Sequence, residues 1–433
     1  MTQTYKKNLS FFPVLAISLF FLSTCFTGYR GGTGTLFIGL GGNGAGGRYY
    51  VQPDEIASLE HEIVLTGPGG TITQKFTGSG TVSFELAAGN WDIKIRALGE
   101  RPVEYSDFFP YDAHMLRALG WANVDISAGK SSTAKIDMLS ATEVTNQEQL
   151  ISVFGSGGFT VVDPELLPEE IIVIKNQLVL DYSATTINRR ITIIAEKEDG
   201  IICRDTSFGD SFFNILDGGI LKLKGIDGGR LILDGSFDTN LSDQLIQVQF
   251  GGVLEMYDNV IIQNNCLDIP IGGAVYINSG SFIMHGGTIT ANSAQCGGAV
   301  YMFETGVQPA IFIMKGGTIS HNSAGNGGGG VYIDTGTFKM SGGTITGNTV
   351  LYGEGGGVFV NSNNLGIFIK EGGGTIYGED AGEVLRNFAV SGKGHAVFAT
   401  GRVVASVVEI PEKQRNFTAG PGVNMNSKED SIW

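Results

Sequence analysis

The stretch that decides the fold reads GGAVYINSGSFIMHGGTITANSAQ and spans residues 272–295. It holds three short apolar runs separated by glycine pairs, and each run recurs downstream every ~25–31 residues, as expected for stacked structural repeats. The first run, Gly272–Ile277, returns at Gly297–Met302, Gly328–Ile333 and Gly355–Val360. We therefore predict an all-β chain whose C-terminal part is a right-handed, three-sided parallel β-helix, with regular repeats over residues ~250–400.

Strand alternation then sorts the side chains of each repeat into an inner and an outer set. Successive coils of such a helix stack ~4.8 Å apart, so equivalent residues form columns. We expect three apolar columns to point inward, comprising Val275, Val300, Val331 and Val358, then Phe282, Phe312, Phe338 and Phe368, and finally Ile289, Ile319, Ile345 and Ile376. An aromatic column points outward, formed by Tyr276, Tyr301, Tyr332, Phe359 and Phe398.

Two further residue types recur with the repeats. Asparagines at corners tolerate left-handed backbone angles and can hydrogen-bond to the neighbouring coil. We predict a structural ladder of Asn264, Asn292, Asn322 and Asn348. Cys266 and Cys296 fall on adjacent coils, within the Cα range of a disulfide, and are a candidate pair in an exported protein.

The N-terminus has the pattern of an export signal. Lys6 and Lys7 precede an apolar run, 11–22, that is shorter than the ~20 residues of a membrane span. Leu22-Ser23-Thr24-Cys25 resembles the bacterial lipobox, which implies cleavage after residue 24 and lipidation of Cys25, and hence a lipid-anchored protein of the outer membrane or cell surface. The alternatives are an ordinary signal peptide with an incidental cysteine, or an uncleaved anchor.

The remaining chain is divided into a linker, 25–34, a β-sandwich, 35–140, and the β-helix, 141–433, with a C-terminal cap over 400–433. Period-2 alternation predicts sandwich strands at Thr35–Leu40, Glu62–Thr66, Thr81–Leu86, Asp92–Ala97 and Ser132–Met138. An Ig-like or transthyretin-like sandwich is the economical interpretation. A capping box at Thr145–Glu148 predicts a short helix that covers the first coil.

The repeats also resemble those of bacterial polymorphic outer-membrane proteins, and more broadly the pectate-lyase-like β-helix class. The G-G-A-V and I-x-x-N elements carry this resemblance over residues ~250–400. It implies surface display and adhesion. The formal charge of −15 repels phosphate backbones and excludes nucleic acid as a partner.

Two functions follow from these features. The first is a non-enzymatic surface lipoprotein that binds a glycan or a host or partner protein through the outward aromatic column, although that column can equally be a stabilising stack. The second is a polysaccharide lyase or glycoside hydrolase on the same fold. Acidic residues cluster at Asp227, Asp234, Asp238 and Asp243, but they lie in turns and are interpreted as solvated charges. We assign no catalytic residue, no metal ligand and no cofactor.

Overall fold

The computed structural model describes residues 32–40, 58–100, 115–154, 169–181, 185–205, 209–236, 243–268, 272–306, 308–361, 364–370, 373–378, 381, 383–392 and 394–400. The predicted signal peptide, Cys25 and the predicted C-terminal cap beyond residue 400 lie outside the described residues.

Eight strands precede the repeats and form two sheets around one core. Strand β1 pairs antiparallel with β4 and parallel with β7, and the second group runs antiparallel in the order β3-β2-β5-β6. Their apolar faces share a cluster that includes Leu36, Ile63 and the fully buried Trp91. The predicted Ig-like or transthyretin-like class stays a prediction. The strands are β1 Thr33–Leu40, β2 Glu60–Gly67, β3 Gly70–Thr77, β4 Gly80–Ala87, β5 Gly89–Gly99, β6 Met115–Ile126, β7 Ser131–Ala134 and β8 Leu139–Val144.

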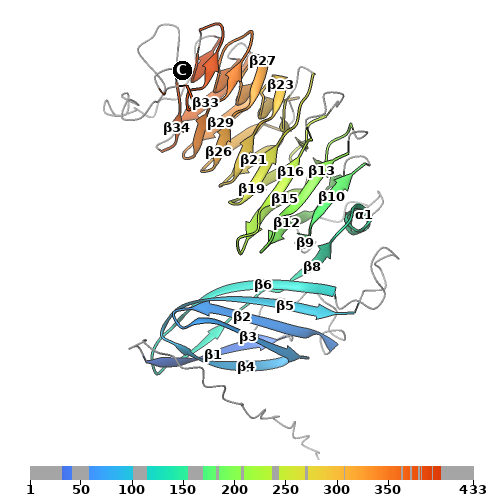
Figure 1. Ribbon diagram of the computed structural model, residues 1–433, viewed down its shortest axis with the longest axis vertical. Coiled ribbons are helices and arrows are strands. Elements are labelled where there is room, and N and C mark those ends of the chain that lie inside the picture. The colour runs from blue at the N-terminus through green and yellow to red at the C-terminus, as the bar shows by residue number, and fades with distance from the viewer. Residues whose placement is uncertain are drawn as a thin grey trace, which may run out of the picture.

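The C-terminal part is a right-handed parallel β-solenoid of about 7 turns, as the repeats predict (Figure 1). One side continues from β8 through β9 Glu170–Ile174, β12 Arg190–Glu196, β15 Ile220–Ile226, β18 Val253–Met256, β21 Ser281–Met284, β25 Ile311–Met314, β29 Gly336–Met340 and β33 Gly366–Lys370.

The two other long sides each contain eight parallel strands. The second side consists of β10 Gln177–Leu180, β13 Gly200–Arg204, β16 Leu231–Asp234, β19 Val260–Gln263, β22 Thr288–Thr290, β26 Thr318–Ser320, β30 Thr344–Thr346 and β34 Thr375–Ile376. The third consists of β11 Thr185–Ile187, β14 Phe213–Ile215, β17 Ile246–Gln249, β20 Val275–Asn278, β24 Val300–Phe303, β28 Val331–Ile333, β32 Val358–Val360 and β36 Val397–Ala399.

The regular coils carry a fourth, short side that the three-sided prediction missed. It follows each corner asparagine and consists of β23 Ser293–Cys296, β27 Ser323–Gly327, β31 Thr349–Val350 and β35 Phe388–Ala389. The first two segments are rich in Ser, Ala and Gly, and the last two are only two residues long, so none shows the apolar alternation that identifies a strand from sequence.

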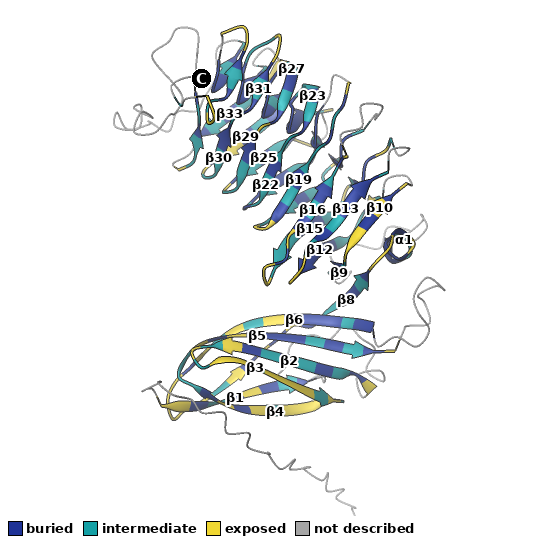
Figure 2. Ribbon diagram, viewed as in Figure 1, coloured by how far each residue is buried: buried dark blue, intermediate teal, exposed yellow. Residues whose placement is uncertain are grey.

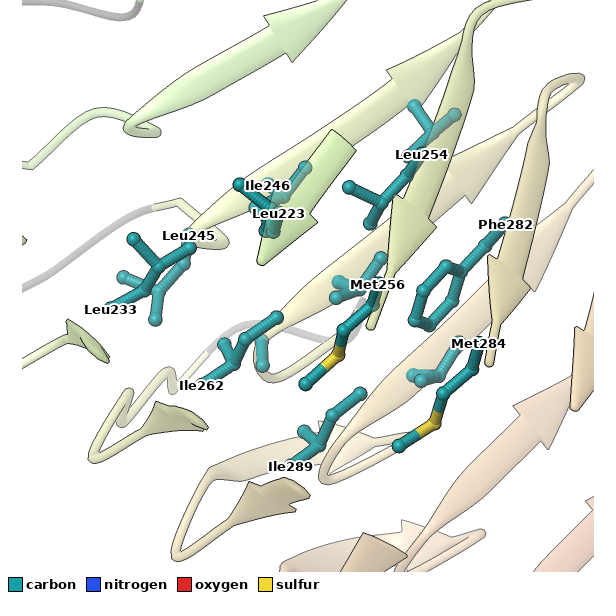
Figure 3. Close-up of a cluster of buried hydrophobic side chains, with 14 of the residues drawn as sticks. Leu223, Leu233, Leu245, Ile246, Leu254, Met256, Ile262, Phe282, Met284 and Ile289 are labelled. Carbon is teal, nitrogen blue, oxygen red and sulfur yellow. The ribbon is translucent and has the colours of Figure 1, made fainter. Parts of the chain in front are cut away.

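The inward columns are confirmed by strand register and burial. Val275 pairs with Val300, Phe282 with Phe312, and the pairing continues residue for residue up the stack. Figure 3 shows the upstream part of this core, where Leu254 and Phe282 come from successive coils of the same side. All three predicted columns are buried, so each coil adds one apolar layer to a continuous core.

Glycine pairs let the corners of adjacent coils approach closely. A Cβ on Gly273 would lie 1.7 Å from the carbonyl oxygen of Gly298 in the next coil. Gly297 adopts a φ of 66°, which L-residues rarely accept. The G-G signature therefore marks a corner where backbone passes over backbone with no room for a side chain.

Helix α1, Gln147–Phe154, begins one residue later than the capping box predicts. Asn146 is the N-cap, since its Oδ1 accepts a hydrogen bond of 2.9 Å from the backbone N–H of Gln149. Gln149 reaches back and accepts one of 2.8 Å from the N–H of Thr145. Leu150 and Phe154 join the solenoid core, where the Phe154 ring lies 6.1 Å from that of Phe213. The role of the helix as a cap stays a prediction.

One 13-stranded sheet runs through both parts of the chain, from β3 to β33. Its weakest link is between β6 and β8, which share only two residue pairs, Ala118↔Ser140 and Leu119↔Leu139. A small apolar cluster closes this joint, where Leu119 of β6 packs with Ile171 of β9 and Ile194 of β12.

A buried ionic network ties the same joint together. The Glu196 carboxylate at the end of β12 has no exposed side-chain area and binds both Lys94 and Arg96 of β5. Arg96 also pairs with Glu143 of β8, and Lys94 Nζ lies 2.6 Å from Asp227 Oδ2. Burial lowers the pKa of Lys94, and the Asp227 carboxylate opposes this effect. Charges from four segments therefore meet where the N-terminal strands join the solenoid.

Candidate functional site

The predicted outward aromatic column forms one continuous stack along the third side. The ring of Tyr301 lies 5.9 Å from that of Tyr276 and 5.2 Å from that of Tyr332. The stack continues through Phe359, at 4.6 Å from Tyr332, to Phe398, at 5.6 Å from Phe359. Parallel β-register places each ring directly above the last.

The stack is more covered than the sequence predicts. Tyr301 is 8% exposed and Phe359 is 7% exposed, while the other three rings are half-buried. Burial raises the pKa of Tyr301 and of Tyr332, and the Asp334 carboxylate acts in the same direction, so both phenols stay protonated. Tyr301 Oη donates to Asp334 Oδ2 at 3.4 Å.

This geometry limits what the column can bind. Aromatic rings bind sugars through a free face, but here the faces contact each other and only ring edges remain accessible. The interpretation of the column as an open platform is therefore corrected in one respect, because Tyr301 and Phe359 are buried between their neighbours. The arrangement favours a stabilising role for Tyr301 and Phe359, and leaves the half-buried Tyr276, Tyr332 and Phe398 at the surface.

The asparagine ladder forms, but it starts one residue later than predicted. Asn292, Asn322 and Asn348 are each almost fully buried, and each accepts a hydrogen bond of 3.0 Å from the backbone N–H of the ladder residue before it. The first rung is Asn265, and Asn387 extends the ladder beyond Asn348. The carboxamides also bond to one another, as Asn322 Nδ2 donates to Asn348 Oδ1 at 2.9 Å.

Asn264, the predicted first rung, occupies the corner position just before the ladder. Its φ is 60°, and its Nδ2 donates to Asp234 Oδ2 at 3.0 Å. Residues at the same corner of the next coils, Ala291 and His321, share the left-handed conformation. Residues 264 and 265 are both asparagines, so the sequence alone did not determine which of them is the first rung of the ladder.

Replacing Asn322 with Ala should lower the free energy of unfolding by about 1–3 kcal/mol, because it leaves buried polar groups on both neighbouring coils without partners. Asn322 Nδ2 donates to the Ile289 carbonyl at 3.0 Å, and that bond would be lost too. Asn264→Ala is the matched control and should cost less than about 1 kcal/mol, since it removes only a partly exposed bond. Urea unfolding measures both, and equal losses would contradict a ladder role for Asn322.

The predicted pairing of Cys266 with Cys296 is not formed. Both thiols are free, as is the buried Cys203. The strand register explains this, because Cys266 bridges to Ser293 in the next coil while Cys296 pairs with Gly327. The two cysteines are thus three residues out of register, a consequence of the ladder beginning at Asn265.

The Cys296 thiol should react slowly with alkylating reagents. Burial and the Asp334 carboxylate raise its pKa to about 11. At pH 8 this lowers the thiolate fraction about 100-fold relative to a thiol at the ordinary value, and only the thiolate is the nucleophile. Iodoacetamide labelling read by peptide mass spectrometry should show a rate that rises about 10-fold per pH unit from 7 to 10. A plateau near pH 9 would contradict the prediction.

A second cluster involves the acidic residues that we interpreted from the sequence as solvated charges. Burial raises the pKa of Asp243, and the nearby negative charge of Asp210 raises it further. The buried Arg204 donates to the Asp243 backbone carbonyl at 3.2 Å, and burial lowers its pKa to about 10. Asp243 is therefore a half-buried group, which corrects its assignment as a solvated charge.

The other acidic residues have structural partners. Asp227 binds Lys94, Asp234 accepts hydrogen bonds from Gln263 and Asn264, and Asp238 lies outside the described residues. No sequence pattern pointed to Asp210 or Arg204, because they become neighbours of Asp243 only through coil stacking.

Within the described residues, no helix has the length and apolarity to cross a membrane, and no group of three or more His, Cys, Asp or Glu side chains is placed to hold a metal ion. Comparison of the sequence with protein-family models finds no matching family, and comparisons with curated proteins and with solved structures find no match.

Proposed function

We propose that this chain is a lipid-anchored, surface-displayed protein that binds a glycan or a partner protein through the flank of its solenoid. The observation that carries the proposal is the continuous sheet from β3 to β33, closed at its weak joint by the buried network around Glu196. This makes the chain a stiff body, in which the N-terminal strands lie at one end and the distal coils of the solenoid lie at the other (Figure 1). Such a body holds a binding flank at a fixed distance from an anchor placed at its N-terminal end.

The anchor in this proposal is Cys25 in Leu22-Ser23-Thr24-Cys25. Acyl chains contribute about 0.8 kcal/mol per buried CH₂, so a multiply acylated cysteine holds a protein to the bilayer without a spanning segment. The N-terminal strands then serve as a sandwich-type spacer, and α1 covers the first coil of the solenoid. The outer membrane or cell surface is the proposed location.

The binding surface combines polar columns with the half-buried aromatic edges. Figure 2 shows that exposed and intermediate residues alternate with buried ones along the solenoid strands, so each outer column presents one side chain per coil. Tyr276, Tyr332 and Phe398 contribute apolar edges to the third side. A regular array with one side chain per coil suits extended ligands such as glycan chains or protein segments.

Metabolic labelling with a palmitate analogue tests the anchor. The chain should incorporate label and partition with membranes, and Cys25→Ser should abolish both, with Cys203→Ser as a matched control that keeps both. Protease treatment of intact cells should remove the solenoid from the wild type. Protection from protease, or labelling that survives Cys25→Ser, would overturn the proposal of a surface lipoprotein.

A second function is favoured by the Asp243 cluster. A carboxyl whose pKa is raised by burial and by a neighbouring carboxylate, beside a buried guanidinium, is a candidate general acid for glycoside hydrolysis. The test is a polysaccharide screen that follows reducing ends and unsaturated products. Turnover that disappears in Asp243→Asn, with unchanged folding, would replace the binding proposal with an enzymatic one.

A further inference from the structure

The first side of the solenoid, from β9 to β33, presents an apolar outer face in its distal coils. Strand register stacks its outward side chains into columns with one residue per coil, and these side chains are half-buried except for the exposed Lys339. The central column reads Lys222, Glu255, Ile283, Ile313, Lys339 and Ile369, and the flanking column reads Ile220, Val253, Ser281, Ile311, Thr337 and Ile367.

No element in the described part of the chain covers this face. The strands there belong to the N-terminal sheets or to the four sides of the solenoid, and α1 lies against β8, β10 and β11. Apolar sheet faces pack against one another at about 10 Å, and an unpaired one marks a contact surface. The face is therefore suited to a second sheet.

The order of charges in the central column makes the face complementary to itself. Two copies can meet with their solenoid axes antiparallel and a two-fold axis between the β21 and β25 coils. Ile283 of each copy then faces Ile313 of the other. Glu255, one coil before Ile283, faces Lys339, one coil after Ile313. Symmetry forms this ion pair twice, as in any contact between identical surfaces.

The positions beside the central column are compatible with this arrangement. In the flanking column Ile220 of one copy faces Ile367 of the other, so the apolar contact extends in both directions along the solenoid. On the other flank, His285 follows β21 and Lys315 follows β25, so these two residues meet. Burial and the neighbouring Lys315 lower the pKa of His285, so its imidazole is neutral at neutral pH and does not repel the ammonium.

Only one register of the antiparallel pair matches the charges. A two-fold axis placed half a coil nearer the N-terminal end sets Lys222 against Lys339. An axis placed half a coil further away sets Glu255 against Ile369 and Lys339 against Ile283. Like charges in contact, and charges buried without a partner, both cost free energy at an interface. The column therefore specifies the register of the pair as well as the contact.

We propose that the outer face of the first side pairs with the same face of a second copy of this chain. Six strands, β15 to β33, carry the face. At ~4.8 Å between strands and about four residues of ~3.3 Å along each, it covers roughly 400 Å² per copy. A standard interface buries ~800 Å² per partner, so the contact is weak and reversible.

The antiparallel pairing has a consequence for anchored copies. The N-terminal strands lie at one end of the chain (Figure 1), so the two copies carry them at opposite ends of the pair. With the N-terminal anchor of the proposed function, on which this step rests, the partners reach toward each other from facing membranes. Many weak contacts between two such surfaces act together and hold the membranes side by side.

Sedimentation equilibrium of the full chain at increasing concentration tests the pairing. The wild type should form dimers and nothing larger. Glu255→Lys and Lys339→Glu should each weaken dimerisation about 10-fold or more, because like charges then face each other twice. An equimolar mixture of the two variants should dimerise as the wild type does, since each copy supplies the charge that the other lacks. Lys130→Glu, at an exposed lysine in the turn between β6 and β7, is the matched control and should change nothing.

Thermal unfolding of each variant verifies that the solenoid is intact. A monomeric wild type, unchanged dimerisation in either single variant, or no recovery in the mixture would each overturn the inference. A different protein captured by this face while the chain itself stays monomeric would overturn it too.

Cells that display the two variants test the step to facing membranes. Cells with Glu255→Lys should clump with cells that carry Lys339→Glu, and neither population should clump with itself. Dimers in solution without such clumping of displaying cells would restrict the pairing to one surface and overturn this step. Dimers in solution from a chain that is not displayed would keep the pairing and overturn the proposed function, and a displayed but monomeric chain would do the reverse.

Discussion

Replacing Glu196 with Ala should lower the free energy of unfolding by about 3–5 kcal/mol, because it leaves two buried cations without their shared carboxylate. Glu196 has no exposed side-chain area, and it binds both Lys94 and Arg96 across the joint between the N-terminal strands and the solenoid. Lys94 retains Asp227, but burial already lowers its pKa, so its charged form is destabilised further. Chemical denaturation followed by tryptophan fluorescence measures the loss, since Trp91 lies in the adjoining core.

The matched control is Glu60→Ala, which removes an ion pair of 2.8 Å between Glu60 and Lys75. That pair is exposed to solvent, so its loss should cost less than about 1 kcal/mol. The double variant Glu196→Leu with Lys94→Met replaces part of the network with apolar contacts and should recover much of the lost stability. If Glu196→Ala costs no more than Glu60→Ala, the network does not hold the joint.

The solenoid was predictable because its information is local and repeated. Each Gly-Gly pair, inward Val and inward Phe recurs in every coil, so the register follows from aligning the repeats, and the pairings of Val275 with Val300 and Phe282 with Phe312 agree with it. The fourth side was not predictable, since segments such as Ser293–Cys296 are too short and polar to show alternation.

The joint depends on contacts between distant segments and could not be predicted from the sequence. Glu196 meets Lys94 across 102 residues, and nothing near either residue indicates the other. Strands β3 and β6 were missed for a simpler reason, because polar or small residues interrupt their apolar pattern.

Phe312→Ala should also lower the free energy of unfolding by about 3–5 kcal/mol, through lost burial and a cavity in the centre of the solenoid. The Phe312 ring is fully buried, with ring centroids 4.8 Å from Phe282 and 4.5 Å from Phe338. Adjacent coils cannot collapse into the space, because their separation is fixed by the hydrogen bonds of the parallel sheets. Urea unfolding measures the change.

Phe312→Leu fills most of the same volume and should lower the free energy of unfolding by less than about 1.5 kcal/mol. Phe37→Ala, at a residue that is 37% exposed, should lower it by less than either Phe312→Ala or Phe312→Leu. Because each coil contacts only its neighbours, the Ala variant should raise amide hydrogen exchange most in the coils that contain Phe282 and Phe338, and much less in the N-terminal strands. A uniform rise along the whole chain would contradict the nearest-neighbour stacking on which the asparagine ladder depends.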